Sequence, residues 1–258
     1  MTTFPTLFVS HGPPTLALDA VPCREFLRGL GNETGRPQAI LCVSAHWQTA
    51  RPCVGAAAEP ETIHDFHGFP EPLYRLRYPA PGAPELARRV AGLLDDAAIG
   101  CDVDRGRGLD HGAWSPLMLM YPDADVPVAQ LSIHAGGDGA HHLALGRALG
   151  PLRDDGVLVV ASGNATHNLS ERGGRDDPAR PWARAFDDWL AEAVAAGRAD
   201  ELVDYLEVAP EAARNHPSPD HYVPLLVALG AAGEGARGRR LHASFLYATL
   251  SMAAFAFA

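Results

Sequence analysis

Apolar residues in this chain gather into short runs that end in turns rich in Gly, Pro or polar residues. Runs of this length and composition are typical of strands. The pattern predicts strands at residues 6–10, 39–45, 126–133 and 157–163, and a further buried strand in the C-terminal run from about Leu241.

Segments with helical spacing lie between these runs. In the first, apolar residues share one face after Pro84 and Glu85, which suit a first helical turn. The second ends at Gly197, a residue typical of helix ends, and the third opens with Pro219 and Asp220. The predicted helices cover residues 83–98, 181–197 and 219–233.

This alternation of strands and helices predicts an α/β fold. We expect one domain over residues 1–258, with a largely parallel central sheet flanked by helices. Long Gly- and Pro-rich segments at 64–82 and 105–113 are predicted to be functional loops.

Composition narrows the class of partner. The 21 basic and 31 acidic residues give a formal charge of −10, which disfavours binding to nucleic acid or to an anionic membrane. The start of the chain lacks a signal-peptide pattern, and the apolar tail is too short to span a bilayer as a helix. None of the four cysteines forms a CxxC pair, so we expect reduced thiols and a cytoplasmic location.

Five of the twelve histidines lie where an apolar run meets a Gly- or Pro-bearing turn: His11, His46, His111, His167 and His221. Imidazole is the commonest metal ligand in proteins and the usual proton shuttle near neutral pH. The pattern therefore predicts a metal centre accompanied by acid–base residues.

The predicted sheet offers a reason for these histidines to meet. His11, His46 and His167 each follow an apolar run closely. Ligands of open α/β sheets bind beyond the carboxyl ends of the strands. We therefore expect a metal cleft at the C-terminal ends of the strands, with all three side chains in it.

Structural roles compete with these assignments. His11 could simply occupy its turn, and His46 could be a core residue. His221 is predicted in the first turn of a helix, five residues after His216, so one of that pair is expected to be structural. Beside His111, Asp110 could orient a ring or cap a helix.

Substrate contacts are predicted from the loop that begins near His64. That histidine and Tyr78 are candidate substrate-binding residues, and Arg75 and Arg77 could bind a substrate carboxylate. There is no GxSxG elbow and no dinucleotide fingerprint, so a serine hydrolase and a Rossmann enzyme are disfavoured.

The chain as a whole resembles the class III extradiol ring-cleavage dioxygenases, specifically the DOPA 4,5-dioxygenase (extradiol) group. The matching segments keep their order from end to end. They are SHGPP (10–14), SAHW (44–47), TIHDFHGFP (62–70), YPAPG (78–82), LDHGAWSPL (109–117), SGNATHNL (162–169), HPSPDHYVPL (216–225) and LSMAAFAF (250–257).

The resemblance implies roles for the five histidines. His11, His46 and His221 are implied as metal ligands, and His167 as the catalytic base or a fourth ligand. His111 is implied as an acid on the oxygen side. Related protocatechuate-type enzymes have a carboxylate as third ligand, and here His221 takes that place. A site of three or four imidazoles suits Zn(II) as well as Fe(II), but Zn(II) has no redox chemistry.

The implied reaction is metal-dependent insertion of O2 into a catechol, DOPA-like or another aromatic diol, to give a ring-opened muconic semialdehyde. The implied cofactor is non-haem Fe(II), with Zn(II) as a plausible bound metal. Two other functions remain open at this point: a zinc-dependent hydrolase, and a Memo-like non-enzymatic binding protein. The sequence leaves monomer and homo-oligomer equally open.

Overall fold

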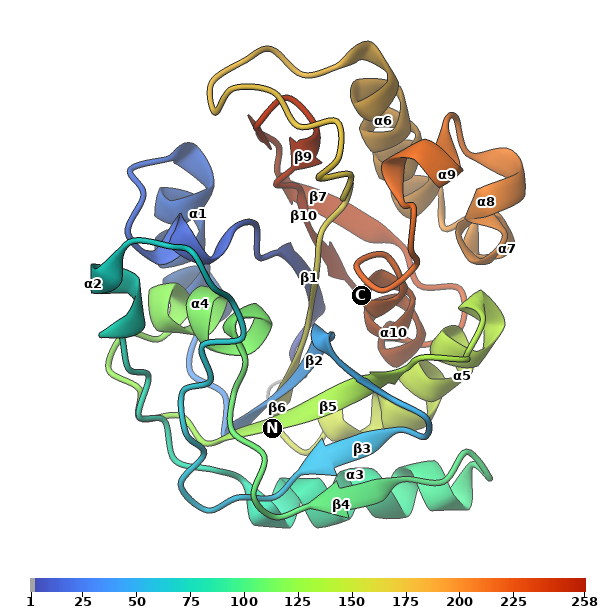
Figure 1. Cartoon of the computed structure of the whole chain (residues 1–258). Coiled ribbons are helices and arrows are strands. Elements are labelled where there is room, and N and C mark those ends of the chain that lie inside the picture. Colours follow the sequence, from blue (N-terminus) through green and yellow to red (C-terminus); the bar gives the residue numbers. More distant parts are fainter. Residues whose placement is uncertain (1–2) are drawn as a thin grey trace.

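The computed structural model, which describes residues 3–258, is built around a twisted sheet of eight strands (Figure 1). Their order across the sheet is β4-β3-β5-β2-β6-β1-β10-β7, and β8 pairs with β9 in a small second sheet. The strands are β1 Thr6–Ser10, β2 Ala39–Thr49, β3 Cys53–Gly55, β4 Asp102–Asp104, β5 Val128–His134, β6 Val157–Gly163, β7 Gly238–His242, β8 Phe245–Leu246, β9 Leu250–Ser251 and β10 Ala254–Phe257.

The centre of the sheet is parallel, as the sequence predicts. β2 pairs in parallel with both β5 and β6, and β6 pairs in parallel with β1. Antiparallel pairing appears at β1–β10, β10–β7 and β3–β5. The predicted C-terminal strand is real but broken, because Tyr247 and Ala248 have φ of 54° and 61° and turn the chain between β8 and β9.

Helices occupy the connections between strands. They are α1 Pro22–Thr34, α2 Glu71–Tyr74, α3 Pro84–Asp96, α4 His111–Met120, α5 Gly139–Leu149, α6 Pro181–Ala196, α7 Ala199–Val203, α8 Tyr205–Val208, α9 Ala212–Asn215 and α10 Val223–Ala232, with short 3₁₀ helices η1 Pro14–Ala17 and η2 Gly150–Arg153.

One helix begins later than predicted. Residues 219–222 form a turn in which the carbonyl of Pro219 accepts from the backbone N–H of Tyr222, and α10 starts at Val223 with Pro224 in its first turn. The prediction that His221 lies inside the first helical turn is therefore wrong, because this residue precedes the helix.

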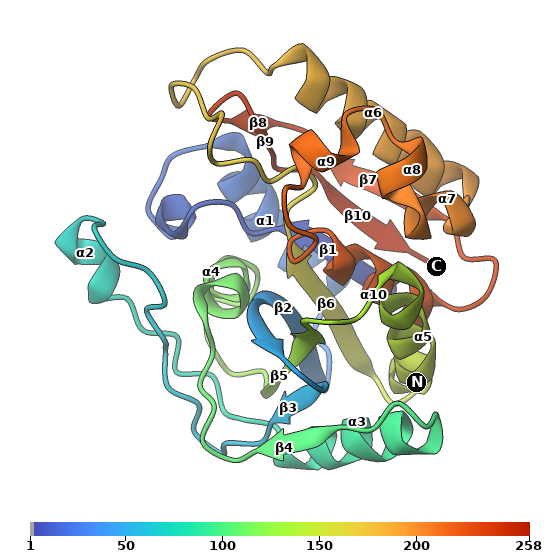
Figure 2. The same cartoon turned by 45° about the vertical axis from the view of Figure 1, so that its right-hand side comes forward.

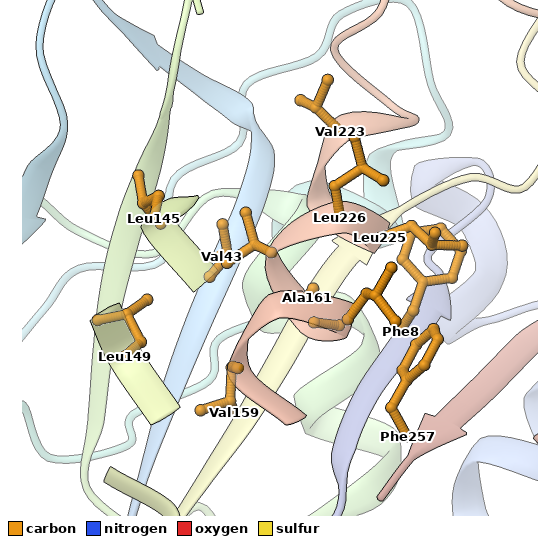
Figure 3. Packing of buried hydrophobic residues seen from close by; sticks show 14 of the residues in the cluster. Phe8, Val43, Leu145, Leu149, Val159, Ala161, Val223, Leu225, Leu226 and Phe257 are labelled. Atoms are coloured by element: carbon orange, nitrogen blue, oxygen red, sulfur yellow. The ribbon is translucent and has the colours of Figure 1, made fainter. Parts of the chain in front are cut away.

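The two faces of the sheet are covered by different helices (Figure 2). Alternate residues of β1, β2 and β6, such as Phe8, Val43 and Val159, pack with α5 and α10 (Figure 3). Their neighbours in the same strands, such as Leu7 and Val160, pack in a second cluster with α1 and α4. Burial on both sides explains why these strands are continuously apolar.

Among residues 3–258, no helix is long and apolar enough to cross a membrane. The four cysteines are free, and Cys42 is fully buried in β2 as a small core residue.

Candidate metal centre and active site

The carboxyl ends of β1, β2 and β6 bring the first histidines together. His11 follows β1 directly, and its backbone N–H donates to the carbonyl of Gly163 at the end of β6 (3.0 Å). His46 lies in β2, where the register against β5 shifts between Ser44 and Gln48. Because of this irregularity, the His46 side chain does not follow the regular alternation of side chains along the strand.

His221 reaches the same place through a close backbone contact. Its carbonyl accepts from the backbone N–H of Asn164 (3.0 Å), just beyond β6. A Cβ atom on Gly163 would lie 2.1 Å from that carbonyl oxygen. Only glycine at this position lets the turn before α10 sit against the end of the strand.

The three rings offer their nitrogens to one point. One ring nitrogen from each of His11, His46 and His221 lies within 4.8 Å of the others, and Nε2 of His11 is 2.9 Å from Nε2 of His46. His11 and His221 are 1% and 4% exposed, so solvent does not satisfy these atoms.

Hydrogen bonds on the far side of two rings determine their tautomers. The Ser162 hydroxyl donates to the carbonyl of Gly112, so it accepts from Nδ1–H of His11 (2.9 Å). Nδ1–H of His221 donates to the Asp220 carboxylate (2.6 Å). In the neutral form of each ring, Nε2 keeps its lone pair, and Nε2 of His221 is buried without any hydrogen-bond partner.

This arrangement fits a metal ion. Burial, followed by repulsion from the neighbouring rings, lowers the pKa of His11 well below its usual value, and the same causes lower the pKa of His46 to about 2. Imidazoles with converging nitrogens, two of them oriented by an outer hydrogen bond from Nδ1, are the donor set that a transition-metal site requires.

His111 stands beside this trio, held by Asp65. The carboxylate accepts from the backbone N–H and from Nδ1–H of His111, each at 2.9 Å, and lies 3.6 Å from Nδ1 of His46. Burial raises the pKa of Asp65, but the bonds and charge of His111 outweigh it and lower the pKa to about 2. The carboxylate thus stays ionised and orients His111.

His167 packs differently. Its ring stacks on His221 with centroids 3.5 Å apart and an interplanar angle of 7°. Burial, followed by the electrostatic repulsion between protonated forms of His167 and His221, lowers the pKa of His167 to about 3, so its ring is neutral at pH 7. Among residues 3–258 its ring nitrogens have no hydrogen-bond partner, and they do not join the converging trio.

These side chains form the floor of a cavity of about 630 Å³, a volume typical of small-molecule sites. Its walls are largely apolar, with a few polar groups. The lining residues are His11, Gly12, Pro13, Pro14, His46, Phe69, His111, His167, Leu169, Arg172, Gly173, Gly174, Arg175, His221, Tyr247 and Leu250.

The structure does not bring the predicted substrate-binding residues His64 and Tyr78 to this cavity. Tyr78 is buried, and its hydroxyl donates to the carbonyl of Tyr121 (3.2 Å). His64 packs against Trp114 and Tyr74 and lies 3.2 Å from the carbonyl oxygen of Leu76. Both side chains are engaged by residues outside the cavity lining.

The two predicted carboxylate-binding arginines also lie outside the cavity lining. Arg75 pairs with Glu71 (2.6 Å), and Arg77 donates to the carbonyls of Tyr74 and Leu76. His216 proves structural, since it is buried and its Nε2 donates to the carbonyl of Ala165 (3.0 Å). Asp110 is the N-cap residue of α4, but its side chain makes no capping hydrogen bond; its carboxylate accepts from Ser44, Arg107 and Gln130.

Sequence reasoning missed the residues that orient the histidines. Asp65 lies in the predicted loop at 64–82, Asp220 in the predicted helix at 219–233, and Ser162 is the penultimate residue of the predicted strand at 157–163. The DH step at 220–221 and the HDFH pattern around Asp65 were available signals, because carboxylates often back metal-binding imidazoles.

Comparison with known proteins identifies the family to which the chain belongs. Residues 5–258 match the family model described as "Catalytic LigB subunit of aromatic ring-opening dioxygenase". The chain belongs to this family, and it is an extradiol ring-cleavage dioxygenase.

Individual relatives narrow the resemblance to one group. The chain is 45% identical over 256 residues to "4,5-DOPA dioxygenase extradiol" of Beta vulgaris, covering 98% of this chain and 96% of that protein. It is 44% identical to the protein of the same name in Escherichia coli (strain K12), covering 89% and 86%. A crystal structure of an uncharacterized protein from Escherichia coli K12 superposes with a TM-score of 0.82 at 38% identity, covering 98% and 99%. The resemblance to the DOPA 4,5-dioxygenase (extradiol) group is confirmed, and the hydrolase and binding-protein alternatives are set aside.

Proposed function

We propose that His11, His46 and His221 hold a divalent metal ion through their Nε2 atoms, and that iron(II) is the ion that supports activity. The buried, unpartnered Nε2 of His221 is the observation that carries this proposal, because an unsatisfied buried nitrogen is costly without a partner. Zn(II) suits the same three imidazoles and is expected to compete for them.

Iron(II) held by His11, His46 and His221 would supply the redox chemistry that a reaction with O2 requires. The protein's own residues position the reactants. Ser162 and Asp220 keep the Nε2 lone pairs of His11 and His221 directed inward, and the apolar walls exclude bulk water.

His167 and His111 are proposed to move protons. The neutral ring of His167 faces the cavity with free nitrogens, so it accepts a proton from a catechol hydroxyl. His111, with Nδ1–H held by Asp65 and its ring centroid 3.9 Å from that of His46, handles the proton on the oxygen side. Because the His167 ring stacks on His221 instead of converging with the trio, we assign it as base and not as fourth ligand.

The proposed reaction consumes one O2 per catechol. The ring bond next to the diol breaks, and both oxygen atoms enter the product, a muconic semialdehyde. Relatives that carry the name 4,5-DOPA dioxygenase make DOPA the first substrate to test.

The test is oxygen uptake by protein stripped of metal and reloaded with Fe(II) under argon, then offered DOPA and a panel of simple catechols. We expect a yellow ring-opened product with one O2 consumed per catechol. No uptake across the panel with Fe(II) confirmed bound would reject the proposal.

Two variants distinguish the proposed metal ligand His11 from the proposed base His167. His11→Ala is expected to lose the metal, whereas His167→Ala keeps it and loses at least about 100-fold in turnover, the usual contribution of a general base. His67→Ala, which removes an exposed histidine outside the cavity lining, is the matched control. Full metal content in His11→Ala would overturn the ligand assignment.

A further inference from the structure

The cavity wall formed by residues 169–175 carries the side chains that remain unexplained. Its backbone is pinned to the turn at Tyr247: the N–H of Gly173 donates to the carbonyl of Tyr247 (2.8 Å), and the N–H of Tyr247 donates to the carbonyl of Arg175 (3.0 Å). These two bonds fix the backbone of this segment at the edge of the cavity, which Leu169 and Arg172 line.

The two arginines on this wall differ in whether an acidic side chain neutralises them. Arg175 pairs with Asp19 (3.4 Å), which neutralises it locally. Arg172 has no hydrogen bond or ion pair with any residue in the range 3–258 that the structure describes. The wall therefore carries one uncompensated positive charge, in a chain whose formal charge is −10.

We propose that Arg172 binds a carboxylate of the substrate, at the end remote from the diol. The inference rests on the proposed catechol reaction and names the substrate class of the same cavity: catechols with an anionic side chain. A guanidinium offers paired N–H donors that match a carboxylate, and its charge repels an ammonium group at the same position.

The cavity lining accounts for the proposed preference for an anionic side chain without any charged residue other than Arg172. The histidines place the diol, and the apolar side chains of Phe69, Leu169 and Leu250 line the same cavity as Arg172. A substrate tail long enough to cross that space meets Arg172.

The test compares three catechols that differ only at the tail: 3,4-dihydroxyphenylpropionate, dopamine and 4-propylcatechol. Their dissociation constants are measured by calorimetry under argon on Fe(II)-loaded protein, so binding is read without turnover. We expect Arg172→Gln to weaken the propionate by about tenfold, the size of one charge-assisted hydrogen bond, and to leave 4-propylcatechol unchanged. Arg172→Glu is expected to reverse the preference in favour of dopamine.

Two controls isolate the charge. Arg172→Lys should retain part of the propionate affinity, and Arg180→Gln, an exposed arginine of the same loop outside the cavity lining, should retain all of it. Added salt should weaken propionate binding to the native protein more than to Arg172→Gln.

Equal affinity of native protein and Arg172→Gln for the propionate, or an equal loss for all three catechols, overturns the carboxylate site. Failure of the proposed function looks different: the propionate still binds more weakly to Arg172→Gln, but no catechol consumes O2 when air is admitted.

Discussion

At the scale of single residues, the site depends on which nitrogen of each imidazole carries the proton. Ser162 and Asp220 accept the Nδ1 protons of His11 and His221, so their Nε2 lone pairs meet His46 in the buried centre. Asp65 does the same for His111. Ser162 and Asp220 thus orient two of the three proposed ligands, and Asp65 orients the histidine beside them.

Removal of one acceptor tests this account. Asp220→Ala is expected to weaken metal binding by roughly 10- to 100-fold, because the His221 ring loses the partner that fixes its tautomer and orientation. Competition against a chromophoric chelator measures the affinity. Asp200→Ala, an exposed carboxylate at the start of α7, is the control and should bind metal like the native protein. Unchanged affinity in Asp220→Ala would show that the carboxylate does not support the ligand.

At the scale of elements, the strand ends and one turn assemble the centre. β1, β2 and β6 are adjacent and parallel, so their carboxyl ends lie at one edge of the sheet. The turn before α10 comes from far along the chain and reaches that edge only because Gly163 has no side chain to block it.

Gly163→Ala tests the role of this contact. The added Cβ would collide with the carbonyl of His221, so we expect unfolding to become easier by about 1–3 kcal/mol and metal content to fall. Urea unfolding and metal analysis measure the two effects. Gly29→Ala in α1 is the matched control: its Cβ meets nothing within 4 Å, and it should stabilise the protein by about 0.5–1 kcal/mol. Native stability and metal content in Gly163→Ala would refute the argument.

At the scale of the whole molecule, several histidines are folded in neutral form, which couples stability to pH. His142 is the clearest case away from the metal centre: Nδ1–H donates to the carbonyl of Asp138 (2.8 Å), and Nε2 accepts from the backbone N–H of His134 (3.3 Å). Burial is the main cause that lowers its pKa from 6.5 to about 4.

The sign of the effect follows from these values. Below pH 6.5 the unfolded chain binds a proton at His142 that the folded chain does not bind until about pH 4, so stability falls as the pH drops through this window. Between pH 7 and 4.5 the loss from His142 amounts to about 2 kcal/mol. His142→Gln should show a correspondingly flatter dependence in metal-free urea unfolding, whereas His67→Gln should follow the native curve. Parallel curves for His142→Gln and native protein would contradict the prediction.

Local patterns in the sequence determined the element types. The apolar runs at 6–10 and 157–163 are strands with those bounds, and the helices at α3 and α6 differ from prediction by only a residue or two. Such runs can be recognised in the sequence because the backbone geometry of a strand or helix fixes how often its side chains return to the same face, within only a few residues. The same local reading marked the five histidines that now line one cavity.

Only the tertiary structure decided which distant side chains meet. Asp65, Asp220 and Arg172 lie in irregular segments, whose course depends on packing against other parts of the chain and not on a local period. For the same reason His64 and Tyr78, though close in sequence to the predicted site, turn away from the cavity lining. The sequence by itself determined the elements, the family resemblance and the histidines; the fold decided which acceptors orient those histidines and which arginines line the cavity.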